Sequence, residues 1–356
     1  MLNIIMRNEY LDFVKGIAIF LVVWGHVIQG AFCMQYSGVN PNLDGIYKLI
    51  YTVHMPLFMG ICGYFFSASL SRYGVKKYIR EKFFKRVVGL VWPMLFFGGV
   101  LHFMLSDNYN ILSWLILSHN GVWFLGCLVV NTSLVLIALL FHEHFRLNYG
   151  LLLFCMWLLS AIPAPIFYGG NGFFMYFFFV VGFEIYKSEK IGKIIKYKYM
   201  IIALYIGLYL LFCSIPYEPV SFNINIFKFG DDKVWDVFIV DVLRVFMGIC
   251  GGGSVLLMLW EVYKKYHLRK FPKWFSNVGK YTLQIYLLQI VILEQLLTQL
   301  YYFFAHRYEY NPLICNGVFF EVVATSFVAI CVLVFIVYVV RIINKSPFVK
   351  TLLFYK

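Results

Sequence analysis

The stretch Asn8–Gly30, NEYLDFVKGIAIFLVVWGHVIQG, has the length and apolarity of a helix that spans a membrane. It nevertheless carries the polar residues Asp12, Lys15, His26 and Gln29, which are costly in hydrocarbon and usually mark a functional site. Lys15 and His26 are eleven residues apart, close to three helical turns, so both project from nearly one face, roughly 16 Å apart along the axis. Asp12 lies on that face one turn before Lys15. This polar stripe predicts the wall of a cavity.

A purely structural interpretation of the same helix stays open. Asp12 and Lys15 would then mark the membrane boundary, with Lys15 extending to the lipid phosphates, and His26 would hydrogen-bond to a neighbouring helix.

The composition excludes a soluble protein. Of the 356 residues, 62% are hydrophobic and only 13% are charged, whereas soluble domains carry roughly 25% charged residues. The net charge of +13 comes from short basic segments between apolar stretches, which is typical of cytoplasmic loops. We therefore expect membrane lipids and no nucleic acid among the partners, and an all-α, polytopic bundle of about ten transmembrane helices.

The ten predicted spans are placed by their apolar character and by a length suited to a bilayer of roughly 30 Å. They cover residues 12–33, 47–66, 87–105, 121–141, 149–165, 172–186, 199–215, 234–260, 279–304 and 315–341.

The distribution of basic residues predicts the orientation. With ten spans, 25 of the 30 Lys and Arg residues fall in the terminal segments and in the loops on the same side as the termini. Because Lys and Arg concentrate in cytoplasmic loops, both termini are expected in the cytoplasm.

The second predicted span, residues 47–66, reads YKLIYTVHMPLFMGICGYFF. Pro56 lacks a backbone N–H and weakens the helix beside His54. Gly60 and Gly63 in the following turns predict the close approach of another helix, and a kinked packing helix alone would account for this pattern.

These two stretches resemble the membrane acyltransferase-3 family, in particular its sugar O-acetylase branch. The family has a basic residue, ten intervening residues and an essential His in its first helix, which correspond to Lys15 and His26. Most members have Arg at the basic position, so the planar guanidinium is lost here. The second stretch matches through HMPLF and a following small-Gly-Tyr-Phe pattern, in which Cys62 stands where many members have Ser.

The basic segment 67–86, SASLSRYGVKKYIREKFFKR, has two interpretations. It suits an amphipathic helix held at the interface by anionic headgroups. Lys85, Arg86 and Pro93 also resemble the arginine motif of the family, which implies cations that hold the phosphates of coenzyme A.

Three further stretches extend the resemblance along the chain. They are GVWFLGCL at 121–128, FFMYFFFVVGF at 173–183 and GKYTLQIYLLQ at 279–289. The last often ends in His in the family and ends in Gln289 here, so no catalytic role is transferred to that position.

Arg244 lies inside a predicted span, three residues after Asp241. The spacing favours a structural ion pair on one helix face. The functional alternative is a cation that holds pantetheine or phosphate. The nearby Gly251–Gly253 is expected to interrupt the helix.

The resemblance implies one transmembrane acyltransferase domain over residues 1–356, in the bacterial inner membrane. It implies transfer of an acyl group, in the first instance acetyl from acetyl-CoA, to a hydroxyl of a cell-envelope or secreted carbohydrate or of a glycolipid, with no metal ion. His26 is the expected base, with Lys15, paired to Asp12, orienting the substrates or contacting phosphate. His54 would assist His26 or donate to the oxyanion, and Lys85 with Arg86 would bind the donor.

The alternative from another functional class is a transporter or flippase of a lipid-linked glycan, which would also place charged residues and broken helices inside the membrane. The sequence shows no internal repeat of the kind that many transporters have, and its polar residues concentrate on the first two spans.

Overall fold

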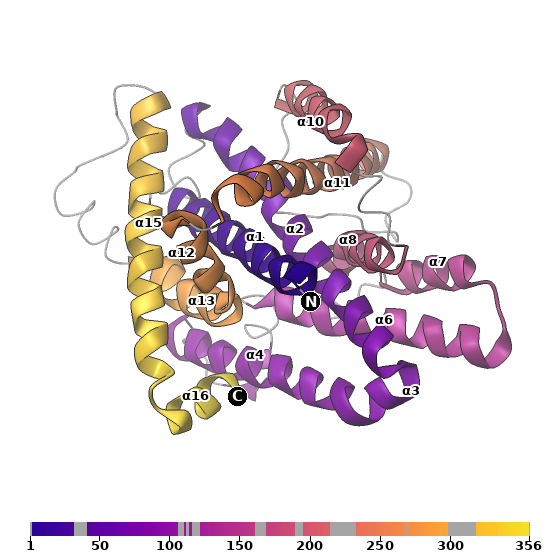
Figure 1. Cartoon of the computed structure of the whole chain (residues 1–356). Helices are drawn as coiled ribbons and strands as arrows, with labels where there is room; N and C mark the ends of the chain where they lie inside the picture. Colours follow the sequence, from indigo (N-terminus) through magenta and orange to yellow (C-terminus); the bar gives the residue numbers. More distant parts are fainter. Residues whose placement is uncertain are drawn as a thin grey trace. The chain divides into compact units, whose positions relative to one another are not determined.

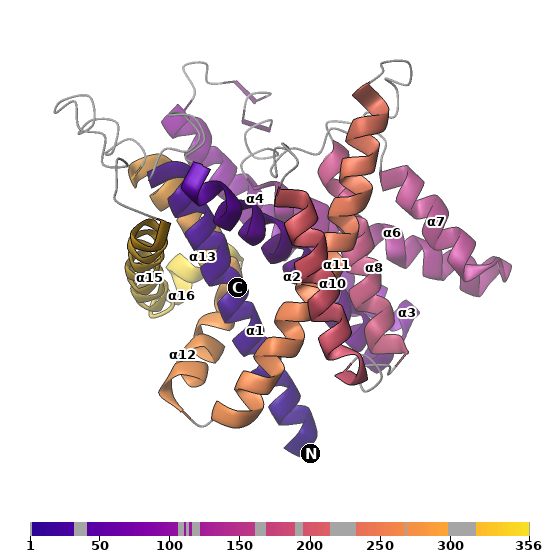
Figure 2. The same cartoon turned by 90° about the horizontal axis from the view of Figure 1, so that it is seen from above.

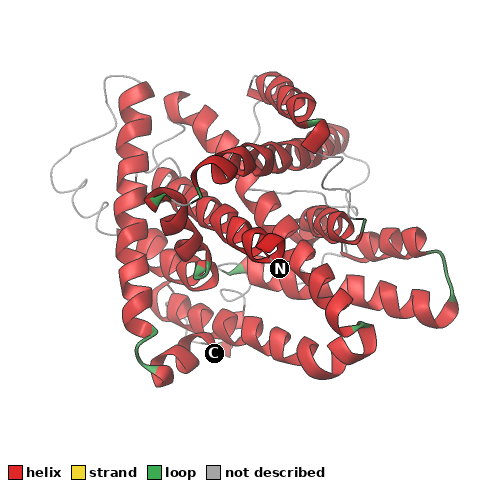
Figure 3. Cartoon of the chain, in the orientation of Figure 1, coloured by secondary structure: helices red, strands yellow, loops and turns green. Residues whose placement is uncertain are grey.

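The computed structural model describes residues 2–31, 41–105, 110–111, 114–115, 122–160, 169–188, 195–213, 233–267, 269–297 and 318–355. Every regular element within these ranges is a helix (Figure 3), which confirms the all-α prediction. The helices are α1 (Leu2–His26), η1 (Val27–Ala31), α2 (Pro41–Tyr73), α3 (Val75–Tyr78), η2 (Ile79–Phe83), α4 (Phe84–Leu105), α6 (Trp123–Phe145), α7 (Tyr149–Ser160), α8 (Gly169–Lys187), α10 (Lys198–Cys213), α11 (Lys233–Tyr266), α12 (Lys270–Gly279), α13 (Thr282–Gln289), η4 (Ile290–Leu297), α15 (Val318–Ile343) and α16 (Pro347–Phe354), where η denotes a π-helix.

Each predicted span overlaps a helix within the described residues, with the first matching α1 together with η1 and the ninth α13 together with η4. Within the described residues, six helices are long and apolar enough to cross a membrane, and three more apolar helices are shorter. The chain is thus an integral membrane protein by length and composition of its helices. The predicted number of about ten crossings is not confirmed.

The helices, which are labelled in Figure 1, belong to two compact units of the chain. The first comprises Met1–His54 and Val255–Leu353, and the second Met55–Ser254 and Phe354–Lys356. The chain passes from one unit to the other within α2, again within α11 and a third time within α16.

The first unit is built around α1, which packs against α12, α13 and α15 (Figure 2). Two glycines bring α1 and α12 into backbone contact. A Cβ at Gly16 would collide with the carbonyl of Phe275, and a Cβ at Gly279 would collide with the carbonyl of Asp12. Each helix therefore supplies one glycine to the contact.

In the second unit, α6 packs against α4, α7 and α8. The part of α2 after Pro56 lies against α8 through three glycines: a Cβ at Gly63 would collide with the carbonyl of Phe179, and one at Gly182 with the carbonyl of Gly60. The predicted close approach of another helix at Gly60 and Gly63 is confirmed. The helix α2 also continues through Pro56.

The expectation that Gly251–Gly253 interrupts a helix is wrong, because α11 continues from Lys233 to Tyr266. A glycine in a helix interior costs about 1 kcal/mol relative to alanine, a cost that packing overcomes. A Cβ at Gly252 would lie 3.8 Å from the Leu57 Cα, and one at Gly253 would lie 3.6 Å from Ile201. The glycines thus belong to a packed helix surface.

Candidate active site

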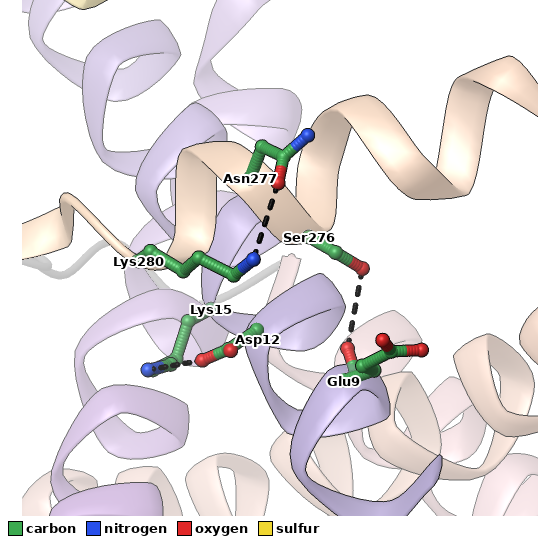
Figure 4. Close-up of polar contacts among 6 residues, drawn as sticks. All are labelled: Glu9, Asp12, Lys15, Ser276, Asn277 and Lys280. Atoms are coloured by element: carbon green, nitrogen blue, oxygen red, sulfur yellow. Dashed lines mark hydrogen bonds and ion pairs between the residues drawn. The ribbon is translucent and has the colours of Figure 1, made fainter. Parts of the chain in front are cut away.

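Asp12 and Lys15 form the predicted ion pair on one face of α1. Lys15 Nζ lies 2.6 Å from Asp12 Oδ1, and each side chain is 21% exposed. The end of α12 lies beside this pair (Figure 4), since Gly279 packs on the Asp12 carbonyl. The charge of Lys15 is therefore largely balanced within its own helix.

Two hydrogen bonds fix α1 against its neighbours one turn before this pair. The Ser276 hydroxyl of α12 donates to the Glu9 carbonyl at 3.2 Å (Figure 4). The Tyr263 hydroxyl donates to the Glu9 carboxylate at 3.3 Å. These contacts fix the position of the charged end of α1.

His26 is the last residue of α1 and is half-buried. The π-helix η1 follows it directly. Such π-helical turns are rare and frequently occur at functional sites, because the wider turn redirects side chains. Two residues before His26, the Trp24 indole N–H donates to the Thr325 hydroxyl of α15 at 2.9 Å. The end of α1 is thereby tied to a second helix.

A cluster of four polar side chains forms where α1 meets α2. The ring centroid of Tyr51 lies 6.5 Å from that of His26 and 4.8 Å from that of His54. The Tyr51 hydroxyl donates to Gln29 Oε1 at 2.6 Å. Gly25 makes room for the aromatic ring, since a Cβ there would lie 2.9 Å from its Cε2 atom. The structure thus brings His26 and His54 together around Tyr51.

His54 is 2% exposed, and its Nδ1 lies 2.6 Å from the Ile50 carbonyl oxygen. Because a carbonyl only accepts, Nδ1 is the protonated nitrogen and the neutral imidazole presents Nε2 as an acceptor. This tautomer suits assistance to His26 rather than donation to an oxyanion, which was the other expected role. The imidazoles are near enough to interact electrostatically.

Sequence reasoning missed Tyr51 as a member of this cluster. Tyr51 is three residues before His54 in α2, so the two side chains share a helix face. That spacing of three residues could have indicated that Tyr51 lies beside His54. The contact with His26 and Gln29 depends on how α1 and α2 pack, which spacing alone does not reveal.

The expected donor-binding cations belong to the second unit. Lys85 and Arg86 lie in the first turn of α4, where Lys85 is exposed and Arg86 is half-buried. The Arg86 guanidinium lies over the Phe66 ring, 5.8 Å from its centroid. This contact orients the Arg86 guanidinium, whereas the Lys85 side chain is exposed on the surface of the chain.

Arg244 is deeply buried in α11, with 4% exposure. Its Nη1 lies 3.2 Å from Asp241 Oδ1, and its guanidinium lies over the Phe174 ring, 5.6 Å from the centroid. The predicted Asp–Arg pair is therefore present. It gives Arg244 an anionic partner inside its own helix.

The family model of the acyltransferase domain matches residues 8–342, nearly the whole chain. The nodulation protein NolL of Mesorhizobium japonicum is 26% identical over 306 residues, which cover 80% of this chain and 76% of that protein. The nodulation protein NolL of Sinorhizobium fredii is 39% identical over 95 residues, which cover 27% of this chain and 24% of that protein. No solved structure matches the chain.

The match spans α1, where Asp12, Lys15 and His26 lie, and α2, which holds Tyr51 and His54. The same match includes Lys85, Arg86 and Arg244. The chain belongs to the acyltransferase-3 family and is a membrane-embedded acyltransferase.

Proposed function

We propose that this acyltransferase transfers an acetyl group from acetyl-CoA to a hydroxyl of a cell-envelope or secreted carbohydrate. The observation that carries the proposal is the cluster of His26, Tyr51, His54 and Gln29, which joins two imidazoles to hydrogen-bonding side chains within apolar helices. The resemblance of α2 to the sugar O-acetylase branch supports a carbohydrate acceptor.

In the proposed reaction, the oxygen of the acceptor hydroxyl attacks the thioester carbonyl while His26 accepts the hydroxyl proton. The tetrahedral intermediate then collapses, the C–S bond breaks, and the coenzyme A thiolate leaves with the proton that His26 had accepted, which restores the neutral base. A positioned base is needed because an alcohol is a very weak acid at neutral pH. The half-buried His26 is the accessible imidazole, and His54 supports it from the buried side.

Donor binding is assigned to Lys85 and Arg86. A guanidinium and an ammonium form charge-assisted hydrogen bonds with phosphate oxygens, and coenzyme A carries several phosphates. The exposure of Lys85 and the orientation of Arg86 over Phe66 support this assignment. Lys15 would assist in orienting the substrates, with Asp12 holding its ammonium. We assign Arg244 a structural role rather than a role in donor binding, because it already forms an ion pair with Asp241.

The charge bias supports a bacterial inner membrane protein with both termini in the cytoplasm. The two NolL relatives come from bacteria, which supports the same location. The acceptor would be a saccharide or a glycolipid that reaches this membrane.

The experiment compares cell-envelope and secreted glycans from cells with and without the gene by mass spectrometry. We expect the loss of a 42 Da acetyl increment from one glycan in the deletion strain, restored by the wild-type gene but not by a His26→Gln gene. In parallel, purified protein is incubated with radiolabelled acetyl-CoA and the extracted glycan. Unchanged glycan masses together with no binding of acetyl-CoA would reject this function and favour a flippase, which has no need of this donor.

A further inference from the structure

The carboxamide of Gln289 is buried and unpaired. The residue is 0% exposed, and neither Oε1 nor Nε2 has a hydrogen-bond partner among the described residues. Buried polar side chains are nearly always hydrogen-bonded, so an exception calls for a specific explanation, such as a role in binding. Both the donor and the acceptor of this side chain remain available.

Gln289 has the same position in its helix as His26 has in α1. His26 ends α1 and is followed by the π-helix η1, and Gln289 ends α13 and is followed by the π-helix η4. Because α13 packs against α1 and η4 packs against η1, the two segments run in the same direction. Each α-to-π junction therefore lies within the stretch where the two segments pack against each other.

A second glutamine of α13 shows what a structural role looks like. Gln284 Nε2 donates to Asn344 Oδ1 and Asn344 Nδ2 donates to Gln284 Oε1, each at 3.1 Å. Both polar atoms of this buried carboxamide are thus satisfied by Asn344, the residue that follows α15. Gln289, five residues later, has no comparable pair among the residues described.

We propose that the Gln289 carboxamide binds the carbohydrate acceptor through the hydroxyls that neighbour the acylated one. A carboxamide donates through Nε2 and accepts through Oε1, and two vicinal hydroxyls offer the complementary acceptor and donor. A thioester carbonyl only accepts, so it would leave Oε1 unpaired. The packing of η4 against η1, which directly follows His26, suits contact of Gln289 with the sugar whose hydroxyl loses its proton to His26.

This inference rests on the proposed function, since it requires a carbohydrate acceptor. The test uses purified full-length protein, radiolabelled acetyl-CoA and a panel of p-nitrophenyl glycosides as acceptors. Three variants are compared with wild type: Gln289→Leu, which has a similar volume without polar atoms, Gln289→Glu, which keeps the acceptor oxygen, and Gln284→Leu as the matched control. The KM of each substrate and the Tm of each variant are measured.

For Gln289→Leu we expect a KM for the glycoside that rises on the order of 10- to 100-fold, because two hydrogen bonds to the acceptor are lost. The KM for acetyl-CoA should stay within about twofold. The Tm should be equal to or above that of wild type, because the substitution removes an unpaired buried amide. Gln289→Glu should retain part of the acceptor affinity. Gln284→Leu should instead lower the Tm, because Asn344 loses both of its hydrogen bonds to Gln284. Both KM values should stay unchanged.

A second measurement repeats the assay with deoxy analogues of the best glycoside. Removal of the hydroxyl that Gln289 binds should raise the KM of the wild-type enzyme for the glycoside. The same removal should have little effect on the KM of Gln289→Leu. An unchanged glycoside KM in Gln289→Leu, or a fall in its Tm like that of Gln284→Leu, would overturn the inference alone. A selective rise in the KM for acetyl-CoA would assign Gln289 to the pantetheine amides and also overturn it. Failure of wild type to acetylate any glycoside would reject the proposed function and this inference with it.

Discussion

The aromatic ring of Tyr51 meets the imidazole of His54 edge to face, with centroids 4.8 Å apart and planes 83° apart. Edge-to-face packing is one of the favoured arrangements of two aromatic rings. The hydroxyl of the same Tyr51 donates to Gln29, beyond the end of α1. One side chain of α2 therefore links the two helices that carry the imidazoles.

The first prediction concerns the Tyr51 hydroxyl. Tyr51→Phe keeps the ring and removes the hydrogen bond to Gln29, so we expect kcat to fall roughly 2- to 10-fold through poorer positioning of His26 and His54. The acetyl-transfer rate of the purified protein measures this effect. Tyr338→Phe, at an exposed position of α15, is the control and should behave as wild type. An unaltered rate in Tyr51→Phe would show that the hydroxyl has no positioning role.

The second prediction concerns His26 as the base. His26→Gln should lower the transfer rate by roughly 10²- to 10⁴-fold, because a positioned general base contributes that much. The half-buried position lets the protein insert and fold, which is checked by its Tm. His144→Gln, an exposed residue near the end of α6, is the control. If His26→Gln retained full activity, the role of base would pass to His54.

The third prediction tests the space that Gly25 provides. In Gly25→Ala, the new Cβ would press on Tyr51 Cε2 at 2.9 Å and on Ile50 Cγ2 at 3.3 Å. We expect a loss of stability of about 1–3 kcal/mol from overpacking, together with lower activity as Tyr51 moves. Gly207→Ala in α10 is the matched control, since nothing lies within 4 Å of its added Cβ, and it should stabilise the helix. Equal Tm values for both variants would contradict the predicted close contact.

The fourth prediction separates donor binding from the chemical step. Replacing Lys85 and Arg86 by Ala should raise the KM for acetyl-CoA more than it lowers kcat, because phosphate contacts exist in both ground and transition states. Binding should also weaken as salt rises, since Lys85 is exposed. The arginine is tested separately as Arg86→Lys, which keeps the charge. The double variant Lys264→Ala/Lys265→Ala, two exposed cations of α11, is the control. Acetyl-CoA binding that survives the loss of Lys85 and Arg86 would move the donor site elsewhere.

The fifth prediction is the topology that follows from the charge bias. Reporter fusions after residues 40, 110, 168, 225 and 310 should report the outside, and fusions after 75, 192, 268 and 350 the cytoplasm. Activity of an alkaline phosphatase and fluorescence of a cytoplasmic reporter distinguish the two sides. A cytoplasmic signal at 225 combined with an external signal at 268 would refute ten spans.

The positions of the helices were predictable from the sequence because hydropathy reports directly on membrane spans. The Asp241–Arg244 pair was predictable as well, because a spacing of three places both side chains on one face. The number of crossings was harder, since α7, α10 and α13 are short and apolar. Length alone does not decide whether such helices cross a bilayer.

The candidate site was predictable only in part. The sequence placed His26 and His54 on separate spans, and their contact through Tyr51 arises from packing between residues far apart in the chain. The sequence also could not predict that the Gln289 carboxamide is unpaired among the described residues. Gln284 and Gln289 are the same residue type in one helix and differ only in their surroundings. The continuity of α11 through three glycines likewise depends on packing that the local pattern does not contain.

The reciprocal glycine contact between α1 and α12 has a consequence for biosynthesis. The partner of Gly16 is Phe275, and the partner of Asp12 is Gly279, so α1 is made more than two hundred residues before the helix that covers it. At roughly 5–20 residues per second, the ribosome needs about 13–53 s to reach that point. During this interval the nascent first helix holds its charged pair in the translocon or the bilayer without α12.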